Sequence, residues 1–285
     1  EYTSNSWSQV GGVLNANQQD NLGKGTGVAI SRDGTTVAIG AINNDTFGRN
    51  VGIVRIYTLV SNTWTLKGNE LPGSGEFNRN ENYGISVSLN GDGTIVATAS
   101  TKSKIRIHQY NSGTDTWDEM NQSSTDSLTP SGDSKFGISL ALSNTGYRIA
   151  VGAYSDDNPG RDIGSVQVLE WSTSSSAWSR IGSILEGEDP VGDGRENFGA
   201  CIDLSEDGTK LIVGSPGFDV TGSGNQGDGS KGSNDGKVYI YEYSSSSWNA
   251  FGNTLTRSDV GDRFGCGVAI SNDGLKIAAA YQGAN

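Results

Sequence analysis

The sequence predicts an all-β fold, a β-propeller of five four-stranded antiparallel blades. Three observations lead to this prediction: a composition that favours turns, a unit that recurs five times, and strand patterns inside each unit. Of the 285 residues, 42 are Gly, 5 are Pro and 33% are hydrophobic. Gly, Ser, Asn and Asp disfavour helix interiors and favour tight turns between short strands.

The recurring unit begins near residues 24, 83, 136, 198 and 264, and we number the units one to five in that order. Three of the copies read FGISLALSNTGYRIAVGA, FGACIDLSEDGTKLIVGS and FGCGVAISNDGLKIAAAY. Self-similarity along the whole chain marks a repeat architecture, in which each unit is one supersecondary structure.

Each unit has the pattern of four strands. In unit three, Ile138, Leu140 and Leu142 alternate with small residues, as in a strand with two different faces. A four-residue turn, SNTG, follows with Gly last, as in a type I turn. The next segment, RIAVGA, is apolar on both faces and should lie between two layers. GSVQVLEW predicts the third strand, and a segment that opens with Trp predicts the fourth.

Four antiparallel strands, repeated along a chain, are typical of a β-propeller. One unit cannot bury both faces of its sheet, so neighbouring units must stack, and a ring hides the sheet edges. We interpret the Trp of each fourth strand as a structural wedge between blades; a sugar-stacking platform is the alternative. The residues concerned are Trp7, Trp64, Trp117, Trp178 and Trp248.

The chain begins with the part that its last unit lacks. Unit five contains the first two strands, whereas EYTSNSW at residues 1–7 matches EYSSSSW at residues 242–248. We therefore expect residues 1–15 to complete the last blade and residues 1–285 to form a single domain. Further repeats outside this sequence would instead make a ring of six or seven blades.

Charge and composition narrow the classes of function. The net charge of −12 makes nucleic acid and anionic membranes unfavourable partners. No run of 18 apolar residues is available for membrane insertion. The single histidine, His108, is expected to be an exposed strand residue, which leaves little basis for histidine-dependent catalysis.

The loops after the second strands of units three and four vary most and are acidic. Binding residues often lie in variable loops on a rigid scaffold, whereas the alternative interpretation is a solvated connection. The candidate ligand-binding residues are Asp156, Asp157, Asp162, Asp219, Asp228 and Asp235.

An acidic residue also precedes the first strand of every unit. Among these residues Asp133 and Asp262 are candidate metal ligands, and calcium is the only cofactor considered. The alternative is that such carboxylates accept hydrogen bonds from turn amides. Paired carboxylates can form a glycosidase site, but a carboxylate present in every unit indicates a structural role. We therefore expect that the protein is not an enzyme.

Two further residue pairs are candidate modification sites. Cys201 and Cys266 fall on opposite faces of first strands in adjacent units, where a disulfide requires Cα atoms within about 7 Å of each other. Two buried thiols are the alternative, and a bridge would support an oxidising compartment. Asn44 and Asn121 begin N-glycosylation sequons.

The whole pattern resembles the FG-GAP repeat family, most clearly over Phe136–Leu169 and Phe198–Tyr243. This family includes the β-propeller of integrin α-subunits and many secreted or surface proteins. The resemblance implies a propeller, an extracellular setting and a non-catalytic adhesive or ligand-binding role. The integrin calcium sites are not carried over, because the four-residue turns here cannot supply the roughly six to eight oxygen ligands of calcium.

We therefore expect an extracellular or cell-surface interaction module that serves adhesion, ligand binding or the building of a surface or filamentous assembly. Its partners would be a protein or glycan ligand, or further copies of itself. A carbohydrate-binding lectin is the first alternative, and a glycoside-active enzyme with a central carboxylate pocket is the second.

Overall fold

The computed structural model describes residues 2–3, 5–14, 20, 22–23, 27–75, 80–120, 135–157, 161–188, 195–219, 234–257 and 262–283. These residues form β-strands, turns and loops, and no helix. Accordingly, the described part of the chain has no helical segment that could cross a bilayer. The prediction of an all-β protein is confirmed.

Units one to four each form one antiparallel sheet of four consecutive strands. Unit one contains β3 (Val28–Ile30), β4 (Thr36–Ala41), β5 (Ile53–Val60) and β6 (Thr63–Leu66). Unit two contains β8 (Ser86–Leu89), β9 (Ile95–Ala99), β10 (Ile105–Asn111) and β11 (Thr116–Glu119). Unit three contains β12 (Ser139–Leu142), β13 (Arg148–Ala153), β14 (Ser165–Ser172) and β15 (Ala177–Arg180). Unit four contains β17 (Cys201–Leu204), β18 (Lys210–Ser215), β19 (Lys237–Ser244) and β20 (Ser247–Ala250).

Shorter strands complete the described structure. After the fourth strand, the chain returns to pair with the start of the third strand in units one, three and four, as β7 (Leu71–Pro72), β16 (Leu185–Glu186) and β21 (Leu255–Thr256). Unit five contributes one hairpin, β22 (Gly267–Ile270) and β23 (Ile277–Ala280). A second hairpin, β1 (Tyr2–Thr3) and β2 (Ser6–Trp7), opens the chain.

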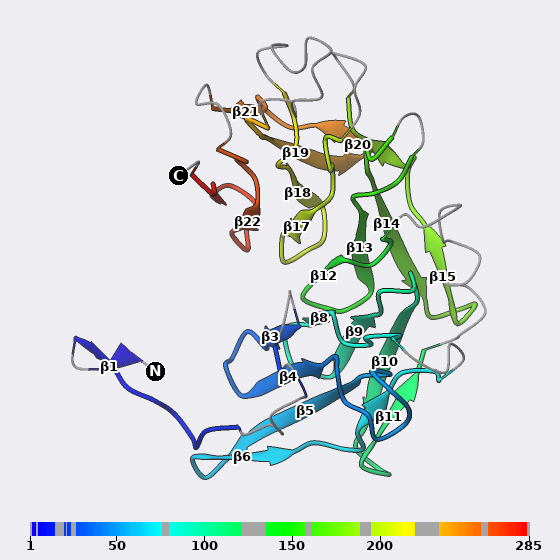
Figure 1. Ribbon diagram of the computed structural model, residues 1–285. Helices are drawn as coiled ribbons and strands as arrows, with labels where there is room; N and C mark the ends of the chain where they lie inside the picture. The colour runs from blue at the N-terminus through cyan, green and yellow to red at the C-terminus, as the bar shows by residue number, and fades with distance from the viewer. Residues whose placement is uncertain are drawn as a thin grey trace.

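The sheets stand side by side in an arc, with the first strand of each unit on the inner side (Figure 1). First strands of successive units contact each other from β3 through β8, β12 and β17 to β22. The N-terminal hairpin lies on the same open side of the arc as β22, but apart from it (Figure 1). The sheets are therefore blade-like, and the ring that they outline is open between units five and one.

Backbone hydrogen bonds connect the four-residue turns of all five units. In units one to four the amide of the second turn residue donates to the carbonyl of its counterpart in the next unit. These bonds run from Arg32 to Gly91 (3.0 Å), Gly91 to Asn144 (2.9 Å), Asn144 to Glu206 (2.8 Å) and Glu206 to Asn272 (3.0 Å). The turns therefore lie at the same end of all five sheets, and we call this side of the arc the turn rim.

The core lies between neighbouring sheets. At each interface, a sheet face with large apolar side chains packs against a face of the next sheet with smaller ones. Leu140 and Leu142 of β12 pack against Ile95 and Ala97 of unit two, and Ile202 and Leu204 of β17 repeat this contact with unit three. Each such interface removes apolar surface from water at roughly 25 cal/mol per Å². Stacking of units, rather than any single sheet, therefore builds the core.

The tryptophans of the fourth strands lie at these interfaces. Trp117 is buried, and its indole N–H donates to the carbonyl of Lys67 in unit one at 2.8 Å. Trp248 repeats the bond with Ile181 of unit three at 3.2 Å, and Trp178 is also buried. The placement of these three buried residues agrees with a structural wedge, whereas Trp7 is 82% exposed.

The N-terminal hairpin has the register of an outer blade hairpin. Tyr2 pairs with Trp7 and their rings lie 5.3 Å apart, as Tyr243 pairs with Trp248 at 5.2 Å. The segment after the hairpin also serves unit one, because the Trp64 indole donates to the carbonyl of Val10 at 3.2 Å. The hairpin therefore resembles the outer part of a blade that precedes unit one, although β1 and β2 pair only with each other in the described structure.

Candidate functional site

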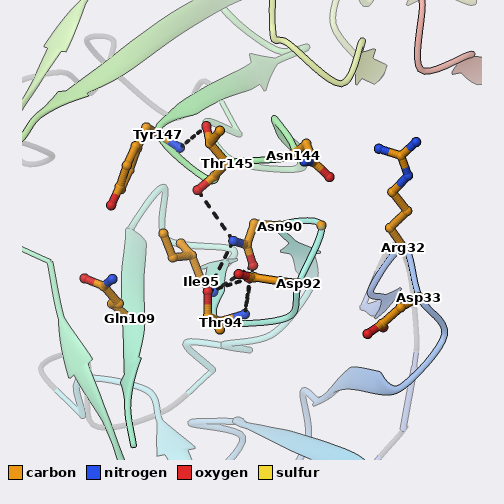
Figure 2. A pocket seen from close by; sticks show the side chains of 11 residues that line it. Arg32, Asp33, Asn90, Asp92, Thr94, Ile95, Gln109, Asn144, Thr145 and Tyr147 are labelled. Atoms are coloured by element: carbon orange, nitrogen blue, oxygen red, sulfur yellow. Dashed lines mark hydrogen bonds between the residues drawn. The ribbon is translucent and has the colours of Figure 1, made fainter.

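A polar groove crosses the turn rim over units one, two and three. Its cavity of about 790 Å³ is lined by groups from three consecutive turns and from the third strand of unit two. We call it the rim groove. The side chains that line it belong to Arg32, Asp33, Asn90, Asp92, Thr94, Ile95, Gln109, Asn144, Thr145 and Tyr147 (Figure 2).

Local hydrogen bonds hold each turn in shape. Asp33 accepts hydrogen bonds from the Ser31 hydroxyl at 2.7 Å and from the Thr35 amide at 2.9 Å. These bonds favour the charged form and lower the pKa of the Asp33 carboxyl. Gly34 closes the turn at φ = 73°, a left-handed conformation that L side chains rarely adopt. The carboxylate therefore enters the groove ionised and fixed.

Amide side chains supply most of the remaining wall. The Asn90 side chain accepts the Thr94 amide at 2.9 Å, and its own NH2 group points to the Thr145 carbonyl (Figure 2). The Tyr147 ring and the Gln109 amide stand together on the opposite side of the groove from Arg32 (Figure 2). The walls thus offer donors, acceptors and one aromatic ring.

A second cavity of about 280 Å³ lies on the axis of the arc, and all five units line it. Arg32 of unit one forms an ion pair across this axial pocket with Glu206 of unit four. Asp203 also lines this pocket, and its two carboxylate oxygens accept the Leu204 and Ile270 amides, each at 2.9 Å. Burial raises the pKa of the Asp203 carboxyl, while these hydrogen bonds oppose the rise.

Sequence reasoning missed the residues of both cavities. The turns were interpreted only as connections, although their second position varies between units: Arg32, Gly91, Asn144, Glu206 and Asn272. Variation at one position of an otherwise regular turn was the available signal. Asp203 carried a similar signal, since the first strands of the other units have Ala or Ser at its position.

The acidic loops predicted to bind ligand lie at the opposite end of the sheets from the turn rim. Their carboxylates serve the loops themselves: Asp157 accepts the Asp162 amide at 2.8 Å, and Asp219 accepts the Asn234 amide at 2.5 Å. Asp45 makes the same bond to the Asn50 amide in unit one, at 2.6 Å. A contact repeated in three units indicates a structural role.

The other predicted loop residues do not gather into one site. Asp156 is buried and accepts the Ser165 hydroxyl at 2.6 Å. Asp235 is also buried, and Asp162 lies 3.6 Å from the guanidinium of Arg161. Asp228 lies outside the described residues.

The acidic residues that precede the first strands are buried wherever the structure describes them. Glu81 accepts the amides of Ser74 and Gly75, both at 3.0 Å, as the turn-amide interpretation expects. Asp262 instead forms an ion pair with Arg257 at 3.0 Å. Asp133, the other predicted metal ligand, lies outside the described residues. Among those described, no group of three His, Cys, Asp or Glu side chains could hold a metal ion.

The two cysteines meet at the interface of units four and five but are not bridged. The Cys201 thiol donates to the carbonyl of Cys266 at 2.7 Å. One unit earlier the hydroxyl at the same position, Ser139, donates to Gly199, whose counterpart in unit five is Gly265 rather than Cys266. Burial and the neighbouring Cys266 raise the pKa of Cys201 to about 11. The candidate disulfide is not formed, and both cysteines are free thiols.

Burial also changes the interpretation of two polar residues. The Asn44 side chain is buried, and its amide donates to Asp20 at 3.2 Å, so this sequon offers no exposed nitrogen for a glycan. Asn121 lies outside the described residues.

His108 was expected to be an exposed strand residue, but its side chain is buried and only 2% exposed. Burial and nearby Arg106 lower the pKa of His108 to about 4.

Comparison with solved structures supports the fold. The chain resembles a "putative 6-phosphogluconolactonase" from Bacteroides uniformis, with a TM-score of 0.53 and 15% identity over 90% of this chain and 63% of that chain. A second protein of that description, from Bacteroides fragilis, has a TM-score of 0.48 and 11% identity over 82% of this chain and 55% of that chain. The chain thus spans less than two thirds of either structure. No curated protein matches it.

This comparison corrects the expectation that the protein is not an enzyme. The Bacteroides uniformis structure, which has a similar fold, is described as a putative enzyme, so the fold gives no reason to exclude catalysis. The sequence argument relied on carboxylates that repeat in every unit. It did not cover residues such as Asp203 that occur in one unit only.

The sequence match is local and falls on unit three. Residues 127–169 match the FG-GAP repeat, which confirms the resemblance drawn from the Phe-Gly, turn and strand pattern. In the described part of this range, β12, β13 and most of β14 are the strands of that repeat. The chain therefore carries an FG-GAP repeat at residues 127–169.

Proposed function

We propose that this protein is an extracellular ligand-binding module of a surface structure, and that its ligand is a glycan. The observation that carries the proposal is the rim groove, a cavity of about 790 Å³ with polar walls. The extracellular setting rests on the FG-GAP repeat, because many proteins with this repeat are secreted or surface proteins.

The chemistry of the groove suits a sugar. The amides of Gln109 and Asn144 and the carboxylates of Asp33 and Asp92 can bond hydroxyl groups, which both donate and accept. Tyr147 offers an aromatic face for the apolar C–H side of a pyranose ring. Hydrogen bonds within the turns fix the carboxylates of Asp33 and Asp92, so these two groups need little ordering when a ligand binds.

A glycan array followed by affinity measurement tests this function. We expect a glycan to bind the wild type, and Tyr147→Ala to weaken binding at least about tenfold, or ~1.4 kcal/mol. Tyr281→Ala is the matched control, because Tyr281 is also exposed but lies outside the groove. Binding that survives Tyr147→Ala would contradict the proposal, as would adhesion to a protein ligand without any glycan.

We also propose that units one to five close into a five-bladed propeller. The two ends of the arc are complementary: Val28 and Ile30 of β3 are 55% and 61% exposed, while their counterparts Val87 and Leu89 are buried against unit one. At the other end, the small side of β23 is exposed at Ala278 and Ala280. Large and small faces of this kind meet in every interface within the arc.

Trp7 provides a test of the closed ring. It is 82% exposed, whereas Trp117 and Trp248 cover Gly68 and Gly182 of the preceding units. Gly252, the equivalent glycine of unit four, has no atom near the position that a Cβ would take. Closure into five blades should seat Trp7 on Gly252. We expect acrylamide to quench wild type and Trp7→Phe equally; extra quenchable emission in the wild type would contradict closure.

A glycan-cleaving enzyme is the second candidate, and the axial pocket is the observation in its favour. Asp203 and Glu206 both line this pocket, and the raised pKa of Asp203 suits a general acid. Incubation with the glycans that bind should then release shorter products, and Asp203→Asn should abolish the release. Binding with no cleavage would leave the lectin function alone.

A further inference from the structure

A second cavity adjoins the rim groove at the interface of units two and three. Its volume is about 560 Å³, and the residues that line it include Tyr110, Asp118 and Trp171. Gln109 lines this cavity as well as the rim groove. We call the second cavity the outer pocket.

Strand pairing shows that the two cavities follow each other along one interface. Gln109 of β10 pairs with Ile95 of β9, which lines the rim groove, and with Asp118 of β11, which lines the outer pocket. In unit three the amide of Trp171, in the outer pocket, donates to the carbonyl of Tyr147, in the rim groove, at 2.8 Å. First strands lie on the inner side of the arc and the other strands follow in order (Figure 1). The path therefore leads from the rim groove outward to the outer pocket.

Trp171 gives the outer pocket an aromatic wall that units one, two and four do not repeat with a Trp. Its counterparts, which also pair with the Trp of the fourth strand, are Leu59, Tyr110 and Tyr243. Trp171 is partly buried, and its ring centroid lies 5.5 Å from that of Trp178. Together with the tyrosine of the rim groove, this ring extends the aromatic wall from one cavity into the next.

Both cavities are acidic. In the outer pocket the Asp118 carboxylate accepts a hydrogen bond from the Asn111 side chain at 3.0 Å, which lowers the pKa of its carboxyl. Asp33 in the rim groove is ionised in the same way. Arg32, which also lines the rim groove, already pairs with Glu206. Fixed negative charges along the path repel ligands that carry carboxylate or sulfate groups.

We propose that the rim groove and the outer pocket form one extended site for a linear oligosaccharide without carboxylate or sulfate groups, whose sugars lie over Tyr147 and Trp171. The inference rests on the proposed glycan-binding function and names the class of glycan. Apolar C–H faces of the sugars pack on the two rings, and hydroxyl groups bond Gln109 and Asp118. Because each cavity by itself has the size of a small-molecule site, a chain gains contacts until it fills both.

A chain-length series tests the proposal. The probes are gluco-, manno-, xylo- and N-acetylchito-oligosaccharides of one to six sugars, with uronic acid and sulfated chains of the same lengths as the acidic arm. We expect a neutral chain of four or more sugars to bind at least about tenfold more tightly than the disaccharide of its series. Acidic chains should bind at least about tenfold more weakly than that neutral chain.

Two variants of the outer pocket locate the gain. Trp171→Leu introduces the side chain that Leu59 supplies at this position of unit one, so the fold should be kept. Asp118 is exposed, and Asp118→Ala should also fold like wild type. In both variants the ratio of tetrasaccharide to disaccharide affinity should fall by at least about threefold. Tyr243→Leu is the matched control, because it changes the same position of unit four outside both cavities and should keep the ratio.

The outcomes separate this inference from the function on which it rests. Affinity that does not depend on chain length, or a ratio that is unchanged in both Trp171→Leu and Asp118→Ala, would overturn the extended site and leave glycan binding in place. Tighter binding of acidic chains, or binding of other glycans with no neutral linear chain among them, would also overturn it. Absence of binding to any glycan would refute the proposed function itself.

Discussion

Burial determines what the polar side chains of this protein can do. His108 and Cys201 both have neighbours that oppose their charged forms, and burial raises the pKa of Asp203 although two backbone amides oppose the rise. None of the three repeats along the chain. Their properties therefore follow from the particular interface in which each one lies, and two of them lead to measurable expectations.

His108 should make the protein less stable in mild acid. Its folded pKa of about 4 lies below the ordinary value of 6.5, so the unfolded chain binds the proton more tightly. The stabilising effect is complete above pH 6.5 and is lost as the pH falls toward 4. Between pH 7 and pH 5, wild type should lose about 2 kcal/mol more than His108→Gln in urea unfolding. Parallel pH profiles would contradict this expectation.

Cys201 should react slowly with thiol reagents while the protein is folded. With a pKa of about 11, its thiolate fraction at pH 8 is roughly a few hundred times smaller than that of an ordinary cysteine. The Cys266→Ser variant isolates this thiol. We expect a slow reaction with Ellman's reagent that accelerates in urea; a rapid reaction without urea would show that the interface of units four and five opens.

At the scale of elements, the second strand of units one, three and four depends on a close approach between backbones. A Cβ on Gly40, Gly152 or Gly214 would collide with the carbonyl of the glycine that opens the next unit, respectively Gly84, Gly199 or Gly265. Neither backbone can move without disturbing its own sheet. A glycine here is therefore required by packing between sheets rather than by the strand itself.

Gly152→Ala should destabilise the protein by about 2–3 kcal/mol, because overpacking against a fixed backbone costs this much. Gly12→Ala is the matched control: no atom lies near its Cβ position, so its stability should stay within about 0.5 kcal/mol of wild type. Thermal and urea unfolding measure both variants. Equal stability of the two would mean that units three and four are farther apart than described.

At the scale of the whole molecule, hydrogen exchange distinguishes an open arc from the proposed closed ring. Every residue of β9 is buried, and β13 is buried except at its first residue, whereas β23 alternates between partly buried and exposed. Repeat proteins gain stability from contacts with both neighbours, which unit five has only when the ring is closed. We therefore expect the amides of β23 to be protected like those of β9 and β13. Fast exchange confined to β23 would contradict closure.

Several features at the scale of single sites could not be read from the sequence. The acidic loops are predicted to bind ligand because they vary between units on a rigid scaffold, and this stays a prediction; the sequence did not show that Asp157 and Asp219 bond amides of their own loops. Nothing in a sequon shows that Asn44 is buried beside Asp20. Arg32 was not singled out, since its partner Glu206 lies three units away along the chain.

The strands, the turns and the likeness of the N-terminal hairpin to an outer blade hairpin could be predicted from the amino-acid sequence. These depend on local chemistry: alternation of apolar residues, turn residues in fixed order, and matching segments such as EYTSNSW and EYSSSSW. Which side chains face a cavity, a loop or the next sheet became visible only in the folded molecule. That outcome depends on how five separate units meet, because the contacts that set burial and charge are long-range.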